Sequence, residues 1–118
     1  MPALTTHILD LTHGQPAAGV AVEVFFFGSG AEKKKITQSV TNADGRVSEP
    51  LVSADEFKAG EYELLYHIGT YFGQKEMNSE GPPFLNRVSV RVSLSEAEAH
   101  YHIPLLISPW GYQVYRGS

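Results

Sequence analysis

Cysteine is absent from this 118-residue sequence. Its absence excludes disulfide bonds, thiolate nucleophiles and zinc sites built on cysteine, and it is compatible with a reducing compartment. No apolar run approaches the roughly 18 residues that a membrane-spanning helix needs. The first residues, Met1 to Leu4, lack the charged start and apolar stretch of a secretory signal peptide. We therefore expect a cytoplasmic protein that does not enter a membrane.

Positive charge is also scarce. Nine Lys and Arg residues against 13 Asp and Glu residues give a formal net charge of -4. This balance argues against a general affinity for nucleic acid or for anionic membranes. The one basic run, Lys33-Lys34-Lys35, is more typical of a solvated strand edge than of a binding patch. The length predicts a single domain over residues 1–118 with one core.

Alternation of apolar and polar residues predicts an all-β protein. Within residues 4–11, for example, Leu4 and Ile8 share one face of the strand and His7 lies on the other. The predicted strands cover residues 4–11, 20–27, 35–40, 47–52, 61–67, 87–94, 100–107 and 112–116. Residues 69–77 suit one short helix. Eight short strands predict a two-sheet antiparallel sandwich, with an immunoglobulin-type domain as the generic alternative.

Two connections have clear turn chemistry. Residues 13–19 contain the Gly and Pro residues that mark a turn. Residues 42–45 read Asn-Ala-Asp-Gly, in which Gly45 can adopt a positive φ and the side chain of Asn42 or Asp44 can bond the local backbone. Arg46 follows directly, so we expect its side chain at the mouth of this turn.

Three segments resemble the motifs of the transthyretin-like hydrolase family. The first is LTTHILD at residues 4–10, followed by GQPA at residues 14–17. The second is HYHIPLLISP at residues 100–109, and the third is the terminal tetrapeptide YRGS at residues 115–118. The resemblance therefore extends over the whole chain. One departure is Gln113-Val114 before the tetrapeptide, where relatives commonly have Ser-Thr, and this puts the pocket shape in doubt.

The resemblance implies an eight-stranded transthyretin-like sandwich with one short helix, assembled as a homotetramer around a channel that holds the active sites. It implies hydrolysis of 5-hydroxyisourate to 2-oxo-4-hydroxy-4-carboxy-5-ureidoimidazoline in urate degradation, without a cofactor or metal. A small-molecule carrier on the same fold is the alternative, as in vertebrate transthyretin, which lacks the two histidines, the arginine and the tetrapeptide. A β-sandwich adhesion or interaction module is a further one.

The resemblance also implies the site. It places His7, Arg46, His102 and Ser118 as catalytic residues, and His7, Arg46, Tyr115 and Ser118 as substrate-binding residues. We expect the two histidines to form a general acid/base pair, since an imidazole with a free pKa of about 6.5 suits proton transfer near neutral pH. Which of them is the base stays open. We expect Arg46 to hold the substrate and stabilise developing negative charge, and Ser118 to orient water or substrate. An acyl-serine is disfavoured because no Asp-oriented His-Ser triad is evident.

Two further points concern the histidines themselves. His100 and His102 can point to one strand face, a spacing that some zinc-binding β-proteins use with a third ligand such as His7. The resemblance implies no metal, and we expect His100 to be a peripheral or structural residue. If Ile8 and Ile103 face the core, His7 and His102 lie on the outer face of a sheet. They would then form a site only where an oligomer covers that face.

Overall fold

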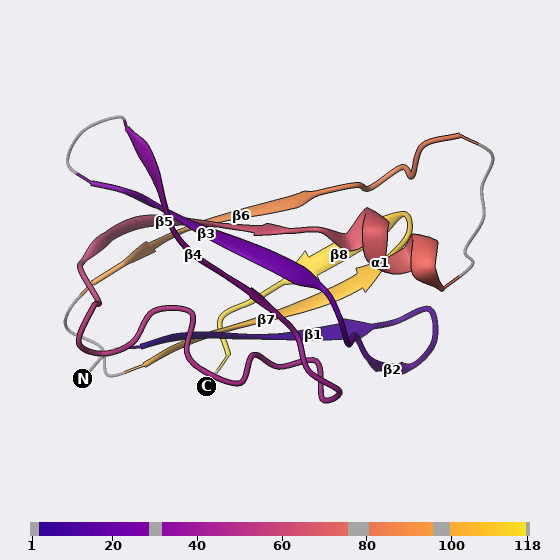
Figure 1. The fold of residues 1–118 in the computed structure, drawn as a ribbon, viewed down its shortest axis with the longest axis horizontal. Coiled ribbons are helices and arrows are strands. Elements are labelled where there is room, and N and C mark those ends of the chain that lie inside the picture. Colours follow the sequence, from indigo (N-terminus) through magenta and orange to yellow (C-terminus); the bar gives the residue numbers. More distant parts are fainter. Residues whose placement is uncertain (1–2, 29–31, 76–80, 96–99, 118) are drawn as a thin grey trace.

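The computed structural model describes residues 3–28, 32–75, 81–95 and 100–117, which form a sandwich of two β-sheets (Figure 1). The elements are β1 (Leu4–Asp10), β2 (Gln15–Pro16), β3 (Ala21–Phe27), β4 (Lys33–Val40), β5 (Gly60–Tyr66), α1 (Ile68–Gln74), β6 (Val88–Leu94), β7 (Tyr101–Ser108) and β8 (Gly111–Val114). One four-stranded sheet has the order β2-β1-β7-β8 and the other has the order β4-β3-β5-β6. The predicted eight-stranded sandwich with one short helix is confirmed for the described residues.

The core lies between the two sheets, where the apolar faces of the strands meet. Leu4 and Ile8 of β1 are fully buried, as are Leu64 and Tyr66 of β5, so the predicted alternation is confirmed in both sheets. Thr6 is the buried polar residue between Leu4 and Ile8, and its hydroxyl bonds the Tyr66 hydroxyl at 2.8 Å. Burial of each large apolar side chain contributes about 1.5–3 kcal/mol. This burial determines which face of β1 remains outside.

The strand pair β1–β7 is parallel, which corrects the expectation of purely antiparallel sheets. Its register places Thr5 opposite His102 and His7 opposite Pro104. Alternation fixes the faces of a strand but not its neighbour or direction, because both depend on contacts far apart in the sequence. The parallel pairing brings the first and second sequence motifs side by side.

The predicted strand at residues 47–52 is wrong. This segment is irregular, and its contact with β1 is limited to an isolated bridge between Leu4 and Val52. Pro50 lacks the N–H group that a continuous ladder needs. The eighth strand is instead β2, which lies inside the predicted turn at residues 13–19 and pairs Gln15 and Pro16 with the end of β1.

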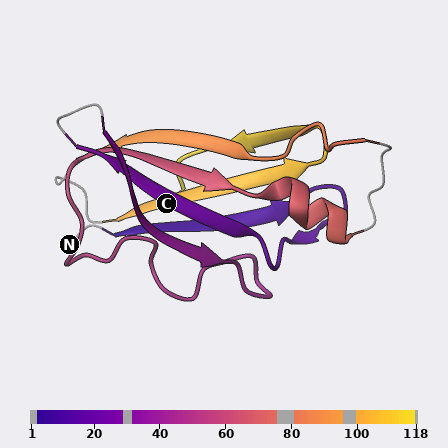
Figure 2. The ribbon, with the colours of Figure 1, turned by 45° about the horizontal axis from the view of Figure 1, so that its top comes forward.

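The helix covers one end of the sandwich (Figure 2). It begins at Ile68 and ends at Gln74, whereas the prediction ran over residues 69–77, of which 76 and 77 lie outside the described residues. Tyr71 of α1 is buried and donates its hydroxyl hydrogen to the Asp10 carboxylate over 2.7 Å. His13 donates to the same carboxylate over 2.6 Å. The helix and the β1–β2 turn are thereby held together at the end of β1.

No helix in the described part of the chain is long and apolar enough to cross a membrane.

The basic run lies on β4, an edge strand, as predicted. Lys33 and Lys35 form ion pairs with Glu63 and Glu23 of the same sheet, at 2.8 and 3.0 Å. Much of the positive charge of the run is therefore neutralised within its own sheet.

Candidate active site

Two imidazoles lie on the outer face of the β2-β1-β7-β8 sheet. His7 belongs to β1 and His102 to β7, and their ring centroids are 6.4 Å apart. Their neighbours Ile8 and Ile103 are 0% and 5% exposed. The prediction that both histidines point away from the core is therefore confirmed, although neither strand pattern by itself placed the two rings together.

The turn at residues 42–45 brings Arg46 to the histidines. The side-chain oxygen of Asn42 accepts hydrogen bonds from the backbone N–H groups of Asp44 and Arg46, at 2.9 and 3.2 Å. This is the side-chain chemistry expected for the turn. The turn then lies against β1, since Ile8 donates its N–H to the carbonyl oxygen of Gly45 over 2.8 Å. As a result Arg46 forms an isolated antiparallel bridge with His7.

Gly45 makes this close approach possible. Its φ is +75°, in the left-handed region that side chains disfavour, and the predicted positive φ is confirmed. A Cβ atom added to Gly45 would lie 2.4 Å from the carbonyl oxygen of Ile8. The turn that carries Arg46 therefore tolerates no side chain at this position.

We expect Gly45→Ala to destabilise the protein more than Gly14→Ala, measured as the free energy of unfolding in denaturant. Gly14 also has a positive φ, of +65°, but a Cβ there would meet no heavy atom of the described residues within 4 Å. Gly14→Ala thus carries the backbone strain alone, about 1–2 kcal/mol. Gly45→Ala carries that strain and the clash with Ile8. Equal losses in the two variants would contradict a tight contact between the turn and β1.

A backbone carbonyl group orients the ring of His7. The Nε2 atom of His7 lies 3.0 Å from the carbonyl oxygen of Asp44. A carbonyl oxygen only accepts hydrogen bonds, so the Nε2 atom carries the hydrogen and donates it. In the neutral ring, Nδ1 is then the nitrogen with the free lone pair.

A hydroxyl group holds the ring of His102. The Nδ1 atom of His102 lies 2.8 Å from the Oγ1 atom of Thr5, the residue opposite it in the parallel ladder. The same Oγ1 atom lies 3.3 Å from the Nε2 atom of His100. Sequence reasoning left Thr5 and His100 out of the site, although Thr5 shares its face with His7, and His100 shares its face with His102. That shared parity was the signal available for both.

Burial and positive charge favour the neutral form of both site histidines. Burial lowers the pKa of His7, and the guanidinium of Arg46 lowers it further, with a partial opposing effect from Asp44. Burial likewise lowers the pKa of His102, followed by the charges of Arg46, His7 and His100. A neutral imidazole can accept a proton at one nitrogen and donate from the other. The pair is therefore suited to proton transfer near neutral pH.

A cavity of about 500 Å³ opens on this face. Its lining residues are Thr5, Thr6, Arg46, Val47, His100 and His102. One permanent cation and two imidazoles in this lining suit a small ligand with oxygen acceptors. The structure thus brings Arg46 and His102 to one cavity, with His7 beside them.

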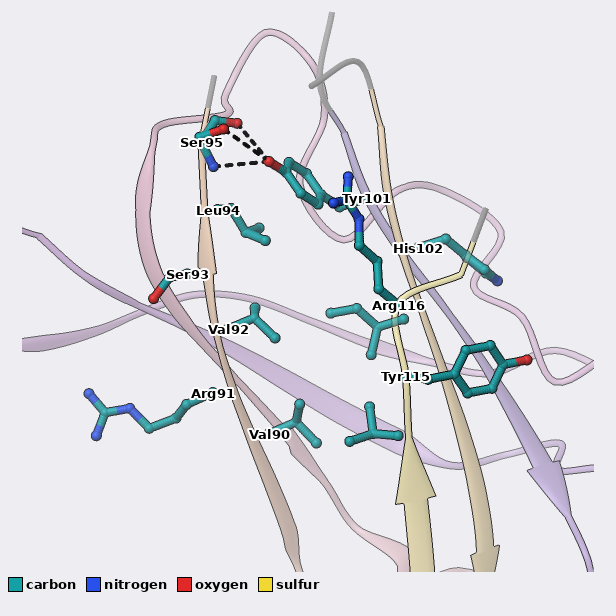
Figure 3. A pocket seen from close by; sticks show the side chains of 12 residues that line it. Val90, Arg91, Val92, Ser93, Leu94, Ser95, Tyr101, His102, Tyr115 and Arg116 are labelled. Atoms are coloured by element: carbon teal, nitrogen blue, oxygen red, sulfur yellow. Dashed lines mark hydrogen bonds between the residues drawn. The ribbon is translucent and has the colours of Figure 1, made fainter. Parts of the chain in front are cut away.

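The C-terminal segment packs against His102. Gly117 donates its N–H to the carbonyl oxygen of His102 over 2.7 Å, and a Cβ on Gly117 would lie 2.7 Å from the ring atom Cδ2 of His102. Tyr115 lies on the same side of the sheet as His102 (Figure 3). Arg116 instead turns toward the ring of Tyr101, 4.8 Å from its centroid. Ser118, predicted as a site residue, lies outside the described residues.

A zinc site would require three ligand side chains, such as those of His7, His100 and His102, to point toward one position. Among the residues that the structure describes, no three His, Cys, Asp or Glu side chains are grouped so that they could hold a metal ion. The Nδ1 atom of His102 faces Thr5, and the Nε2 atom of His7 faces a carbonyl oxygen. The described geometry therefore supports hydrogen bonding at these nitrogens.

Comparisons with known proteins find hydrolases and transthyretins that are similar to this chain over nearly its whole length. The family model for the HIUase/Transthyretin family matches residues 4–117. The chain is 44% identical to the 5-hydroxyisourate hydrolase of Halalkalibacterium halodurans, over 98% of this chain and 97% of the relative. The structure of Klebsiella pneumoniae 5-hydroxyisourate hydrolase is similar with a TM-score of 0.80 and 36% identity, covering 100% of both chains. Sea bream transthyretin in complex with thyroxine is similar with a TM-score of 0.88 and 28% identity, covering 98% of this chain and 94% of that one.

Proposed function

The chain belongs to the HIUase/Transthyretin family, and from that premise we propose that it hydrolyses 5-hydroxyisourate to 2-oxo-4-hydroxy-4-carboxy-5-ureidoimidazoline in urate degradation. The observation that carries the proposal is the grouping of His7, His102 and Arg46 on one outer face, beside one cavity. These are three of the four residues that the sequence resemblance implied for catalysis, and the fourth, Ser118, lies outside the described residues. The Halalkalibacterium halodurans relative supports the choice of substrate.

The reaction opens a cyclic amide with water. The water oxygen forms a bond to the ring carbonyl carbon, the C–N bond breaks, and the leaving nitrogen gains a proton. One of the neutral imidazoles, His7 or His102, takes a proton from the water and becomes an imidazolium, and that imidazolium, directly or through the other ring, supplies the proton that the leaving nitrogen gains. Because Nε2 of His7 is engaged by the Asp44 carbonyl, the proton-accepting atom of His7 is Nδ1. No covalent intermediate is required.

Arg46 stabilises the negative charge that develops on the carbonyl oxygen of the substrate. Its guanidinium is permanently charged and presents several donors in a plane, which suits a planar heterocycle with carbonyl oxygens. The same cation favours the neutral form of both imidazoles before the reaction starts. Arg46 therefore has three roles: it binds the substrate, stabilises the oxyanion and favours the neutral form of the imidazoles. Tyr115 and Ser118 complete the proposed substrate-binding set.

The experiment that tests the function is the decay of freshly made 5-hydroxyisourate with purified protein. We expect a loss faster than the spontaneous rate, so every measurement needs a blank without enzyme. Transthyretin with thyroxine on the same fold makes a carrier the second candidate. A carrier would bind a ligand without turnover, and a decay equal to the blank would favour it.

We propose that the working form is a homotetramer. His7 and His102 lie on an outer face that is open in a single chain, and a partner covering that face would exclude water from the site. Apolar side chains are exposed around the same sheet, with Leu11 at 58% and Trp110 at 68% exposure. A cavity of about 540 Å³ also lies between the edge strands β6 and β8, lined partly by Val90, Val92 and Leu94 (Figure 3). Such edges and patches are typical of association surfaces.

Light scattering at micromolar concentration is expected to report the mass of a tetramer of the 13.0 kDa chain. The physical reason is the burial of the exposed apolar side chains and open sheet edges described above. Activity measured over a dilution series should fall where the tetramer dissociates. A stable monomer with full activity would show that the site is complete within one chain.

Residues 1–118 are proposed to act as one domain in the cytoplasm. One core is shared by both sheets, which supports the single domain. The lack of cysteine suits a reducing compartment and supports the location. Fractionation of cells with detection of the native protein tests the location.

A further inference from the structure

The hydroxyl group of Thr5 lies between two imidazoles. Its Oγ1 atom is 2.8 Å from Nδ1 of His102, 3.3 Å from Nε2 of His100, and 3.4 Å from the carbonyl oxygen of Tyr101. The neighbouring Thr6 does not share this arrangement, because its hydroxyl bonds the Ile103 carbonyl oxygen and Tyr66 inside the core. Thr5 is therefore the threonine of the first motif whose hydroxyl group lies within hydrogen-bond distance of the imidazoles.

A hydroxyl group suits this position because it both donates one hydrogen and accepts others. It can donate to Nδ1 of His102, which leaves the hydrogen of that ring on Nε2. It can equally accept from Nδ1 while donating to His100 or to the Tyr101 carbonyl oxygen, which leaves the lone pair on Nε2. Thr5 is thus compatible with both neutral tautomers and with the imidazolium form of His102. A methyl group in its place would support none of them.

We propose that Thr5 and His100 form a proton relay behind His102, with Thr5 as a positioning residue that holds the His102 ring. The proposal rests on the proposed hydrolysis. When Nε2 of His102 takes a proton from water, the Nδ1–H bond breaks and a new Oγ1–H bond forms. The original hydroxyl hydrogen of Thr5 passes to Nε2 of His100. The net result is one proton moved from water to His100, and hydroxide is left to attack the substrate. The reverse transfer, from His100 through Thr5 to His102, supplies the proton that the leaving nitrogen gains.

The location of His100 suits the outer end of the relay. It is exposed, so a proton that arrives there exchanges with solvent or buffer. His102 itself is half-buried, and Arg46 and His7 disfavour a lasting positive charge on it. The other charged residues nearby lie elsewhere: Asp44 is next to the His7 ring, and the guanidinium of Arg116 lies over the ring of Tyr101. A route that removes the proton from His102 therefore relieves a charge that its surroundings oppose.

The first test compares Thr5→Val with Thr5→Ser. Valine keeps the shape of threonine without the hydroxyl group, and serine keeps the hydroxyl group. We expect Thr5→Val to lower kcat by roughly ten-fold or more, with a smaller change in KM, and Thr5→Ser to restore most of the rate. Thr37→Val, the same change on β4 of the other sheet, should match the wild type. Circular dichroism and light scattering establish that each variant is folded and assembled.

The second test uses His100→Ala and added imidazole. We expect a loss of roughly ten-fold that rises back toward the wild-type rate as imidazole is added, because the buffer replaces the outer acceptor. Imidazole should not rescue Thr5→Val, in which the inner link is missing. The double variant should be little worse than Thr5→Val, since both changes interrupt one path. Each rate is corrected for the decay of substrate in the same buffer without enzyme.

The outcomes separate the relay from the proposed function. If the wild-type protein does not accelerate hydrolysis, the function is wrong. If the wild type is active, full activity in Thr5→Val or in His100→Ala overturns the relay. It is also overturned if imidazole fails to restore His100→Ala, or restores Thr5→Val equally well. A loss in Thr5→Val that serine does not rescue would reduce Thr5 to a packing role.

Discussion

Replacing His102 with alanine is expected to lower kcat/KM for 5-hydroxyisourate by about 100- to 10 000-fold, the usual contribution of a general acid or base. His7→Ala should have a loss of similar size. Each change removes one half of a pair whose rings lie 6.4 Å apart on the same face. The measurement is the steady-state rate above the no-enzyme blank, together with light scattering to confirm assembly.

A matched control is available in His67→Ala. His67 lies beyond the end of β5 and bonds the Glu23 carboxylate over 2.7 Å, on the other sheet. Its loss should leave turnover unchanged. His102→Asn adds a second comparison, because its amide group can still bond Thr5 but cannot exchange a proton. Wild-type turnover in either His7→Ala or His102→Ala would remove that residue from the mechanism.

The pH dependence follows from the same pair. A histidine whose pKa is lowered stays neutral to lower pH, so the acid limb of kcat/KM should fall below the free histidine value of about 6.5. Arg46→Gln removes a positive charge that opposes protonation of both rings. The pKa of each ring should then rise, and the acid limb should move to higher pH along with the loss in rate. A limb that stays in place would show that Arg46 does not influence the titrating group.

Deletion of Tyr115 to Ser118 is expected to abolish hydrolysis while the fold is retained. The last residues of most chains contribute little to stability or function, so their deletion is ordinarily harmless. Here, however, Gly117 bonds the backbone of His102 and lies against its ring, and Tyr115 lies on the same side of the sheet. Removing the segment exposes the His102 ring and takes away the proposed contacts of Tyr115 and Ser118. Residues added after Ser118 should have the same effect, because they would crowd the outer face that holds His7 and His102 and that a partner subunit is proposed to cover.

A graded series separates the parts of this segment. Ser118→Ala should be mild, since it removes one hydroxyl group and leaves the backbone of the segment unchanged. Gly117→Ala should be more severe, because its Cβ would lie 2.7 Å from Cδ2 of His102 and must displace the ring. Circular dichroism and an oligomer assay accompany each rate, as loss of assembly would imitate loss of chemistry. Wild-type turnover in a tail-deleted, assembled protein would reduce the tetrapeptide to a structural remnant.

The sequence by itself determined the faces of the strands and the turn chemistry. Alternation placed Leu4 and Ile8 inside and His7 outside, and the Asn-Ala-Asp-Gly turn placed Arg46 directly after a positive-φ glycine. Both are local properties, since a strand has a period of two and a turn is specified by four residues. The family motifs added the proposed identity of the site residues, which no local pattern contains.

Only the tertiary structure decided which residues meet. The parallel register that sets Thr5 beside His102 joins positions 97 residues apart. The contact of Gly45 with Ile8 brings Arg46 to His7. The irregular backbone of residues 47–52 could not be recognised from the apolar residues of that segment. The reason is physical. Alternation says which side of a strand is buried, but the choice of neighbouring strand depends on the packing of the whole core.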